Sequence, residues 1–199
     1  NANFNVLWAN EHDKSIWKTY EDNHKETFLD KRSILDIDSK EIPDCVGVIG
    51  GPPCQSWSSA GNGLGFKDAR GKLFNEFIRV LNDKQPLFFL AENVKGMMSK
   101  RHKKSFDKIK GKLQNAGKGY NVSVKVLNAS DYGVPQNRKR VFFIGYRKDL
   151  KLEFQFPEPS VIKKTVKDKI WDLQSSAIPA INGSISNARK CTILNHEYW

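Results

Sequence analysis

The chain has 199 residues, of which 39% are hydrophobic, enough for one domain with a real core or for one domain and part of another. No apolar run approaches the roughly 20 residues of a membrane span, and the N-terminus lacks a signal-peptide layout, so we expect neither a membrane nor a secreted protein. The three cysteines are odd in number and lack metal-ligand spacing, which predicts a reduced, cytoplasmic setting and no metal site. The formal charge of +11 indicates a polyanionic partner.

The first half of the chain alternates short apolar runs with amphipathic segments. Residues 5–9 are predicted to form a strand, and Asp13 can cap a helix whose apolar residues recur at helical spacing. Residues 46–49 predict the next strand. Residues 70–82 predict a helix with one apolar face, and residues 87–90 a further strand.

The same alternation continues in the second half. An amphipathic helix over residues 106–113 is expected to end near Gly117, and strands are predicted at 122–126 and 141–146. This order of strands and helices predicts an α/β fold, with a mostly parallel, Rossmann-like sheet and helices on both of its faces.

The composition and hydrophobic pattern of the chain change after about residue 156. Prolines become more frequent and periodicity weakens, apart from a short helix expected near residues 166–173. We therefore predict a first domain over residues 1–157, and a linker with the start of another region over residues 158–199.

The stretch Gly50–Trp57 follows an apolar run and carries Cys54 directly after two prolines. A cysteine on a rigid turn at the carboxyl end of a strand is placed for nucleophilic work, because ligands of open α/β sheets bind there. The alternative is an ordinary turn with a half-buried cysteine. Two other segments with polar residues lie at strand ends, Ala91–Val94 and Gln136–Arg140.

Taken together, the three segments would place a thiol, a carboxylic acid and two guanidinium groups at one edge of the sheet. A thiol protease would need a histidine that activates its cysteine. The four histidines of this chain show no recognisable protease pattern, which disfavours that function.

The motifs Pro53-Cys54-Gln55, Glu92-Asn93-Val94 and Gln136-x-Arg138-x-Arg140 resemble, in this order, three signature motifs of the DNA cytosine-5 methyltransferases. The resemblance extends over about residues 5–150 and implies the Rossmann-like fold of methyltransferases that use S-adenosylmethionine. The wider sequence resembles bacterial restriction-modification enzymes of the HaeIII type, which modify GGCC.

The resemblance implies a catalytic role for four residues. Cys54 would add to C6 of cytosine, and Glu92 would hold a proton at N3 of the base. Arg138 and Arg140 would position Glu92, the base's O2 and nearby phosphates. The target atoms lie inside duplex DNA, so the base would be flipped out of the helix. Without the resemblance, Glu92 could simply pair at a strand end, and the arginines could form a basic phosphate-binding loop.

The resemblance also implies a site for S-adenosylmethionine, the methyl donor. Glu11 would accept hydrogen bonds from the ribose hydroxyls, and Asp36 one from the exocyclic amine of adenine. Asp36 and Ile37 also fit an ordinary acidic turn, and Leu73 also fits the buried face of a helix. The implied cofactor residues are Glu11, His12, Asp36, Ile37, Pro53 and Leu73.

The implied partner is double-stranded DNA. Residues 56–72, rich in Gly and Ser, correspond to the mobile loop that closes over DNA in the resembling family. The expected DNA contacts are Gln55, Ser58, Ser59, Arg70 and Asn93.

The family's first, glycine-rich motif would precede Asn5, and its last motifs would follow Trp199. The resemblance therefore predicts a chain that is incomplete at both ends. Two hypotheses remain open. The chain contributes the catalytic centre of a working methyltransferase, completed by flanking sequence or a complementary subunit, or it is an inactive fragment that binds DNA without turnover.

Overall fold

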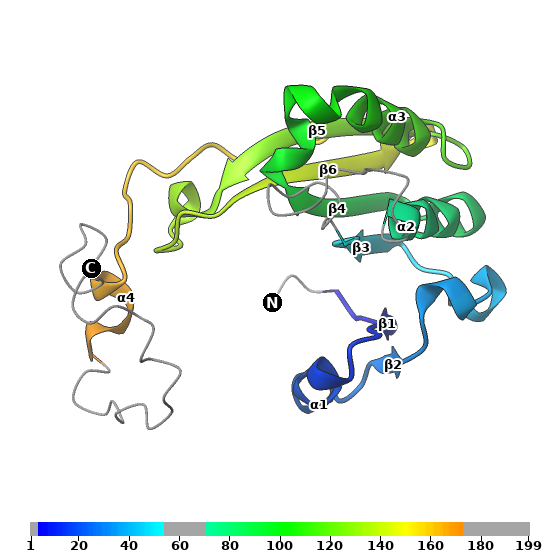
Figure 1. Ribbon diagram of the computed structural model, residues 1–199, viewed down its shortest axis with the longest axis horizontal. Helices are drawn as coiled ribbons and strands as arrows, with labels where there is room; N and C mark the ends of the chain where they lie inside the picture. The colour runs from blue at the N-terminus through cyan, green and yellow to red at the C-terminus, as the bar shows by residue number, and fades with distance from the viewer. Residues whose placement is uncertain (1–3, 54–70, 173–199) are drawn as a thin grey trace. The chain divides into compact units, whose positions relative to one another are not determined.

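The computed structural model describes residues 4–53 and 71–172 (Figure 1). The chain divides into two compact units. The first combines residues 1–125 with 141–155, and the second combines residues 126–140 with 156–199. The predicted domain boundary at residue 157 stays a prediction. Within the described residues, no helix is long and apolar enough to cross a membrane.

The first unit begins with a small parallel β-α-β arrangement. Strand β1 (Trp8–Asn10) pairs with β2 (Phe28–Asp30), and helix α1 (Lys14–Asn23) connects them. Asp13 caps this helix as predicted, since its carboxylate accepts a hydrogen bond from the Ser15 amide at 2.9 Å. The strand expected at residues 5–9 starts only at Trp8.

A second sheet has four strands in the order β3-β4-β6-β5. Strands β3 (Gly47–Gly50) and β4 (Phe88–Val94) are parallel. Strands β5 (Tyr120–Asn128) and β6 (Lys139–Arg147) are consecutive, and Figure 1 shows them running in opposite directions. Both β4 and β6 are longer than the apolar runs that predicted them, because the polar motif residues next to those runs continue the strands.

Helices α2 (Gly71–Lys84) and α3 (Lys103–Gln114) cover one face of this sheet. The ring of Phe143 on β6 contacts Phe74 of α2 and Phe106 of α3, with centroid distances of 6.4 and 5.5 Å. Since one side chain meets both helices, α2 and α3 pack on the same face. The sequence pattern had predicted helices on both faces, and among the described residues these two share one.

The other helical elements of the described residues are short. They are η1 (Ile34–Asp36), η2 (Ser39–Glu41), η4 (Lys95–Met98), η5 (Lys100–His102), η6 (Ala129–Tyr132), η7 (Lys148–Leu150) and α4 (Lys167–Ile170).

Tyr120 anchors the start of β5 in the core. Its side chain is 1% exposed, its ring packs edge-on against Phe89, and its hydroxyl donates a hydrogen bond to the Pro86 carbonyl at 2.9 Å. Burial raises the pKa of this hydroxyl to about 12. Proton loss is therefore harder in the folded than in the unfolded protein, where the pKa is about 10.

We expect the stability of the protein to fall as the pH rises from about 10 through 12, because the unfolded state then binds fewer protons than the folded state. Below pH 10 this contribution is fully present. Tyr120→Phe should remove this part of the pH dependence and should cost about 1 kcal/mol at neutral pH through the lost hydrogen bond. Denaturant unfolding at several pH values measures both effects, and an unchanged alkaline slope in the variant would contradict the assignment.

Candidate active site

The parallel pairing of β3 with β4 brings two of the sequence motifs together. Gly50 lies opposite Ala91 in the register, so the next pair along the strands is Gly51 and Glu92. A β-carbon built on Gly51 would lie 3.5 Å from Oε2 of Glu92. The Glu92 carboxyl group therefore lies beside the main chain of Gly51, directly after β3. Gly51 precedes Cys54 by three residues in the sequence.

Asn93 ties the same two strand ends together through its side chain. It is 2% exposed, its Nδ2 donates to the Pro52 carbonyl at 3.1 Å, and its Oδ1 accepts from the Val94 amide at 2.9 Å. The turn that leads into Cys54 is thus fixed to β4. Both ends of the Asn93 amide have main-chain partners, and its predicted DNA contact stays a prediction.

Alternation along β4 sets the environment of Glu92. Phe89, Ala91 and Asn93 are buried on the side of the sheet that faces the helices. Glu92 lies on the opposite side and is half-buried. Its carboxyl group is thus kept out of the apolar core while remaining at the strand end.

The catalytic cysteine predicted from the sequence, Cys54, lies outside the described residues. The same holds for four of the predicted DNA contacts, Gln55, Ser58, Ser59 and Arg70, and for residues 173–199.

In the second unit, residues 129–138 connect β5 to β6. The Ala129 amide donates to the Arg138 carbonyl at 3.0 Å. The side-chain amide of Asn128 donates to Ser130 Oγ at 2.7 Å and to Asn137 Oδ1 at 3.1 Å. Asn128 therefore closes the connection that carries the Gln-x-Arg-x-Arg motif, a role that sequence reasoning did not assign.

The two arginines of this motif differ in exposure. Arg138 is exposed, whereas Arg140 is half-buried and donates from Nη1 to the Lys139 carbonyl at 3.0 Å. Their approach to Glu92 or to a bound base stays a prediction.

Two carboxylates predicted to hold the cofactor lie at the ends of short elements in the first unit. Glu11 follows β1 and is half-buried, and its Oε1 accepts from the Asp13 amide at 2.8 Å. Asp36 ends η1 and is exposed, and within the described part of the chain its carboxylate has no hydrogen-bond or ion-pair partner. A carboxylate only accepts hydrogen bonds, so both groups suit the hydroxyls and the amine of a nucleoside.

The other four residues predicted for the cofactor site have different environments. The Ile37 side chain is 3% exposed and packs with Ile42 and Val80. Leu73 is half-buried, while His12 and Pro53 are exposed. Their contacts with a cofactor stay predictions.

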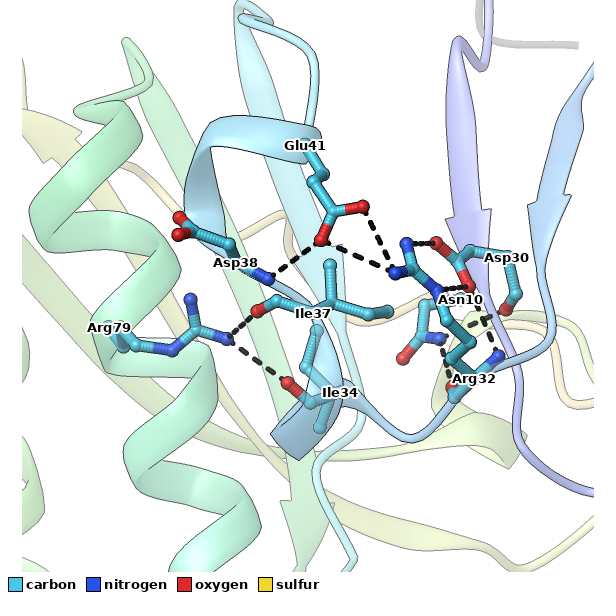
Figure 2. A network of polar contacts seen from close by, with 8 residues as sticks. All are labelled: Asn10, Asp30, Arg32, Ile34, Ile37, Asp38, Glu41 and Arg79. Atoms are coloured by element: carbon cyan, nitrogen blue, oxygen red, sulfur yellow. Dashed lines mark hydrogen bonds and ion pairs between the residues drawn. The ribbon is translucent and has the colours of Figure 1, made fainter.

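A polar network braces the segment between β2 and η2 (Figure 2). Arg32 donates to both carboxylate oxygens of Asp30, at 3.0 and 2.7 Å, and also reaches Glu41 at 3.0 Å. The Arg32 guanidinium holds the pKa of the buried Asp30 carboxyl below its ordinary value. The Asn10 side chain donates to the carbonyls of Asp30 and Arg32 and so fastens the segment to β1.

Metal ligands do not cluster in the part of the chain that the structure describes. No three His, Cys, Asp or Glu side chains there are grouped closely enough to hold a metal ion.

Comparison with known proteins agrees with these motifs. The parallel pairs β1–β2 and β3–β4, connected through helices, define an α/β protein with a Rossmann-like sheet. The family model of the C-5 cytosine-specific DNA methylases matches residues 1–199, and the chain belongs to this family.

Curated relatives extend the match over nearly the whole chain. The Type II methyltransferase M.FnuDI of Fusobacterium nucleatum is 53% identical over 99% of this chain and 57% of its own length. M.MthTI of Methanothermobacter thermautotrophicus is 49% identical over 99% of this chain and 58% of its own length. The chain thus spans little more than half of these relatives. It covers 92% of M.AquIA of Picosynechococcus, at 38% identity.

Solved structures show the same fold. A DNA modification methyltransferase encoded within an E. coli prophage superposes with a TM-score of 0.72 at 32% identity, over 85% of this chain and 49% of that one. DNMT2 of Spodoptera frugiperda gives a TM-score of 0.63 at 21% identity, over 90% of this chain and 54% of that one. The second likeness concerns the fold alone.

Proposed function

We propose that the protein transfers a methyl group from S-adenosylmethionine to C5 of a cytosine in duplex DNA, as part of a restriction-modification system. The observation that carries the proposal is the position of Glu92, whose carboxyl group lies beside Gly51, with Asn93 bonded to Pro52. The acid Glu92 and the turn that leads to the Cys54 thiol thus lie at the same ends of two neighbouring strands. The relatives, which are Type II methyltransferases, also support the proposal.

The proposed chemistry uses these groups in sequence. The Cys54 thiolate forms a bond to C6 of the base, which places negative charge on the ring. A proton that Glu92 holds at N3 neutralises this charge. Electron density moves to C5, which becomes nucleophilic. S-adenosylmethionine, when bound, would supply an electrophilic methyl group. C5 would form a bond to this group as the group's bond to the cofactor's sulfur breaks, and S-adenosylhomocysteine would leave as the product. C5 then loses its proton to a base or to solvent, and the bond from C6 to Cys54 breaks.

The proposal requires access to a base that is normally stacked. C5 and C6 of a paired cytosine lie inside the duplex, so the base has to leave the helix before Cys54 can reach it. The net charge of +11 supports binding to the phosphate backbone. Arg138 and Arg140 are the proposed contacts to the base and to nearby phosphates, and GGCC remains the proposed target.

The cofactor site is proposed to use Glu11 for the ribose hydroxyls and Asp36 for the adenine amine. Both carboxylates are positioned by main-chain contacts of their own segments, since Glu11 donates its amide to Asp30 and Asp36 donates its amide to Ser33. Among residues 4–53 and 71–172 the Asp36 carboxylate has no hydrogen-bond or ion-pair partner, and its side chain is exposed, which supports this assignment because an amine can approach it directly.

A second candidate is favoured by the coverage of the relatives. The chain matches 57% of M.FnuDI and 58% of M.MthTI. These 199 residues would then bind duplex DNA without turnover on their own, and methyl transfer would need further sequence, either in the same chain or in a complementary subunit.

A duplex that carries 5-fluorocytosine tests the proposal. Fluorine at C5 cannot leave as a proton does, so a methylated base stays bonded to the enzyme. With S-adenosylmethionine we expect a covalent protein–DNA adduct, which Cys54→Ser should abolish. Cys45→Ser is the matched control, because Cys45 is a half-buried free thiol that precedes β3, whereas the motif follows this strand, and it should retain the adduct.

An adduct that persists in Cys54→Ser would remove Cys54 from the proposed role. Duplex binding without any adduct by the unaltered protein would support the second candidate.

A further inference from the structure

Arg79 on helix α2 reaches across to the segment that follows β2. Its Nη2 donates to the main-chain carbonyls of Ile34 and Ile37, at 3.1 and 3.0 Å (Figure 2). Its Nη1 donates to Ser39 Oγ. One guanidinium therefore binds three groups of residues 34–39, and all three are at least 40 positions away in the sequence.

The guanidinium is itself held in place from its own helix. Arg79 Nε donates to Glu76 Oε2 at 2.6 Å, one turn earlier in α2. Asp83, one turn later, accepts a hydrogen bond from Ser39 Oγ at 2.5 Å. The planar guanidinium group has several N–H donors in fixed directions, so Arg79 can form all of its hydrogen bonds at once. A lysine ammonium group cannot reproduce this geometry.

Packing reinforces the same junction. The residue after Arg79, Val80, packs against the buried side chain of Ile37. Ile37 is therefore held twice by α2, through its side chain and through its carbonyl group. On the other side of the segment, Asp38 and Glu41 form a reciprocal capping box, and Glu41 also binds Arg32.

Asp36 is located between the two carbonyls that Arg79 binds. The contacts at Ile34 and Ile37 fix the main chain on both sides of it, while its own carboxylate has no partner within the described residues. An arginine on another element therefore holds the main chain on both sides of Asp36.

We infer that Arg79 is a positioning residue for nucleoside recognition, which orders residues 34–39 before the cofactor binds and so presents the Asp36 carboxylate to the adenine amine. This inference rests on the proposed cofactor site. The expected ligand is the adenosyl group, shared by S-adenosylmethionine and its product.

The test compares Arg79→Lys with Arg147→Lys. Arg147 is a suitable control because it also binds a carboxylate, Asp149, and a main-chain carbonyl, Gln85, elsewhere in the same unit. We expect Arg79→Lys to weaken binding of S-adenosylhomocysteine about tenfold by calorimetry, as the loss of one charge-assisted anchor would predict. Arg147→Lys should leave the affinity unchanged.

A second measurement needs no cofactor. Hydrogen exchange of the amides in residues 34–41 should become faster in Arg79→Lys than in the unaltered protein, while exchange in β4 stays the same. Glu76→Gln should act in the same direction, since it removes the ion pair that holds the guanidinium on α2.

Combination with Asp36→Ala separates the possible outcomes. If Arg79 acts through Asp36, Arg79→Lys should weaken binding much less in the Asp36→Ala background than alone. Equal weakening in both backgrounds would overturn the positioning role. Binding that Asp36→Ala leaves unchanged would overturn the adenine contact, and no binding by the unaltered protein would overturn the proposed function itself.

Discussion

Glu92→Gln should lower the rate of methyl transfer by about 10²-fold or more, because an amide cannot hold and release the proton that N3 of the base requires during addition. The substitution keeps the size of the side chain, which lies half-buried beside Gly51 at the end of β3. We therefore expect the fold and the affinity for duplex DNA to change little, so that the loss falls on the chemical step.

Single-turnover transfer of labelled methyl groups to a duplex measures this effect. Glu153→Gln is the matched control, since it makes the same chemical change at an exposed position, and it should transfer at the normal rate. Unaltered transfer in Glu92→Gln would mean that the carboxyl group only supports the strand end.

Helices α1, α2 and α3, the three long helices in the described part of the chain, were predictable from the sequence because their signals are local. Asp13 caps α1, and the apolar residues of α2 and α3 recur at helical spacing, so each pattern lies within one segment. Strand β2 was missed because Phe28–Asp30 is too short for alternation to show. It exists through its pairing with β1, which no local pattern contains.

The site was found from the sequence only as far as its motifs reach. Glu92 could be named from a family resemblance, but its place beside Gly51 depends on the register of β3 and β4, which are about 40 residues apart. The DNA contact of Asn93 stays a prediction, and the structure adds a contact that the sequence did not show, the hydrogen bond from its side-chain amide to the Pro52 carbonyl. Arg79 reads locally as one more charge on an amphipathic helix, since its partners lie in a distant segment.

Asn93→Ala should combine a loss of stability with a loss of chemistry. The Pro52 carbonyl and the Val94 amide would both lose a partner next to a side chain that is 2% exposed, which should lower the free energy of unfolding by about 2 kcal/mol. The turn that leads into Cys54 would also lose its side-chain tie to β4. A displacement of about 1 Å in a reacting group can slow a reaction about 10²-fold, and we expect a loss of this order.

Denaturant unfolding measures the loss of stability. The rate of adduct formation with 5-fluorocytosine measures the loss of chemistry, under conditions in which the variant is still folded. Asn23→Ala is the control, because Asn23 also donates to a main-chain carbonyl, that of Thr19 at 2.7 Å, but on the exposed end of α1. It should change stability by less than about 0.5 kcal/mol and leave adduct formation intact. If Asn93→Ala is destabilised yet forms the adduct at the normal rate, the bond to Pro52 serves only the fold, and the position of Cys54 must be fixed by other contacts.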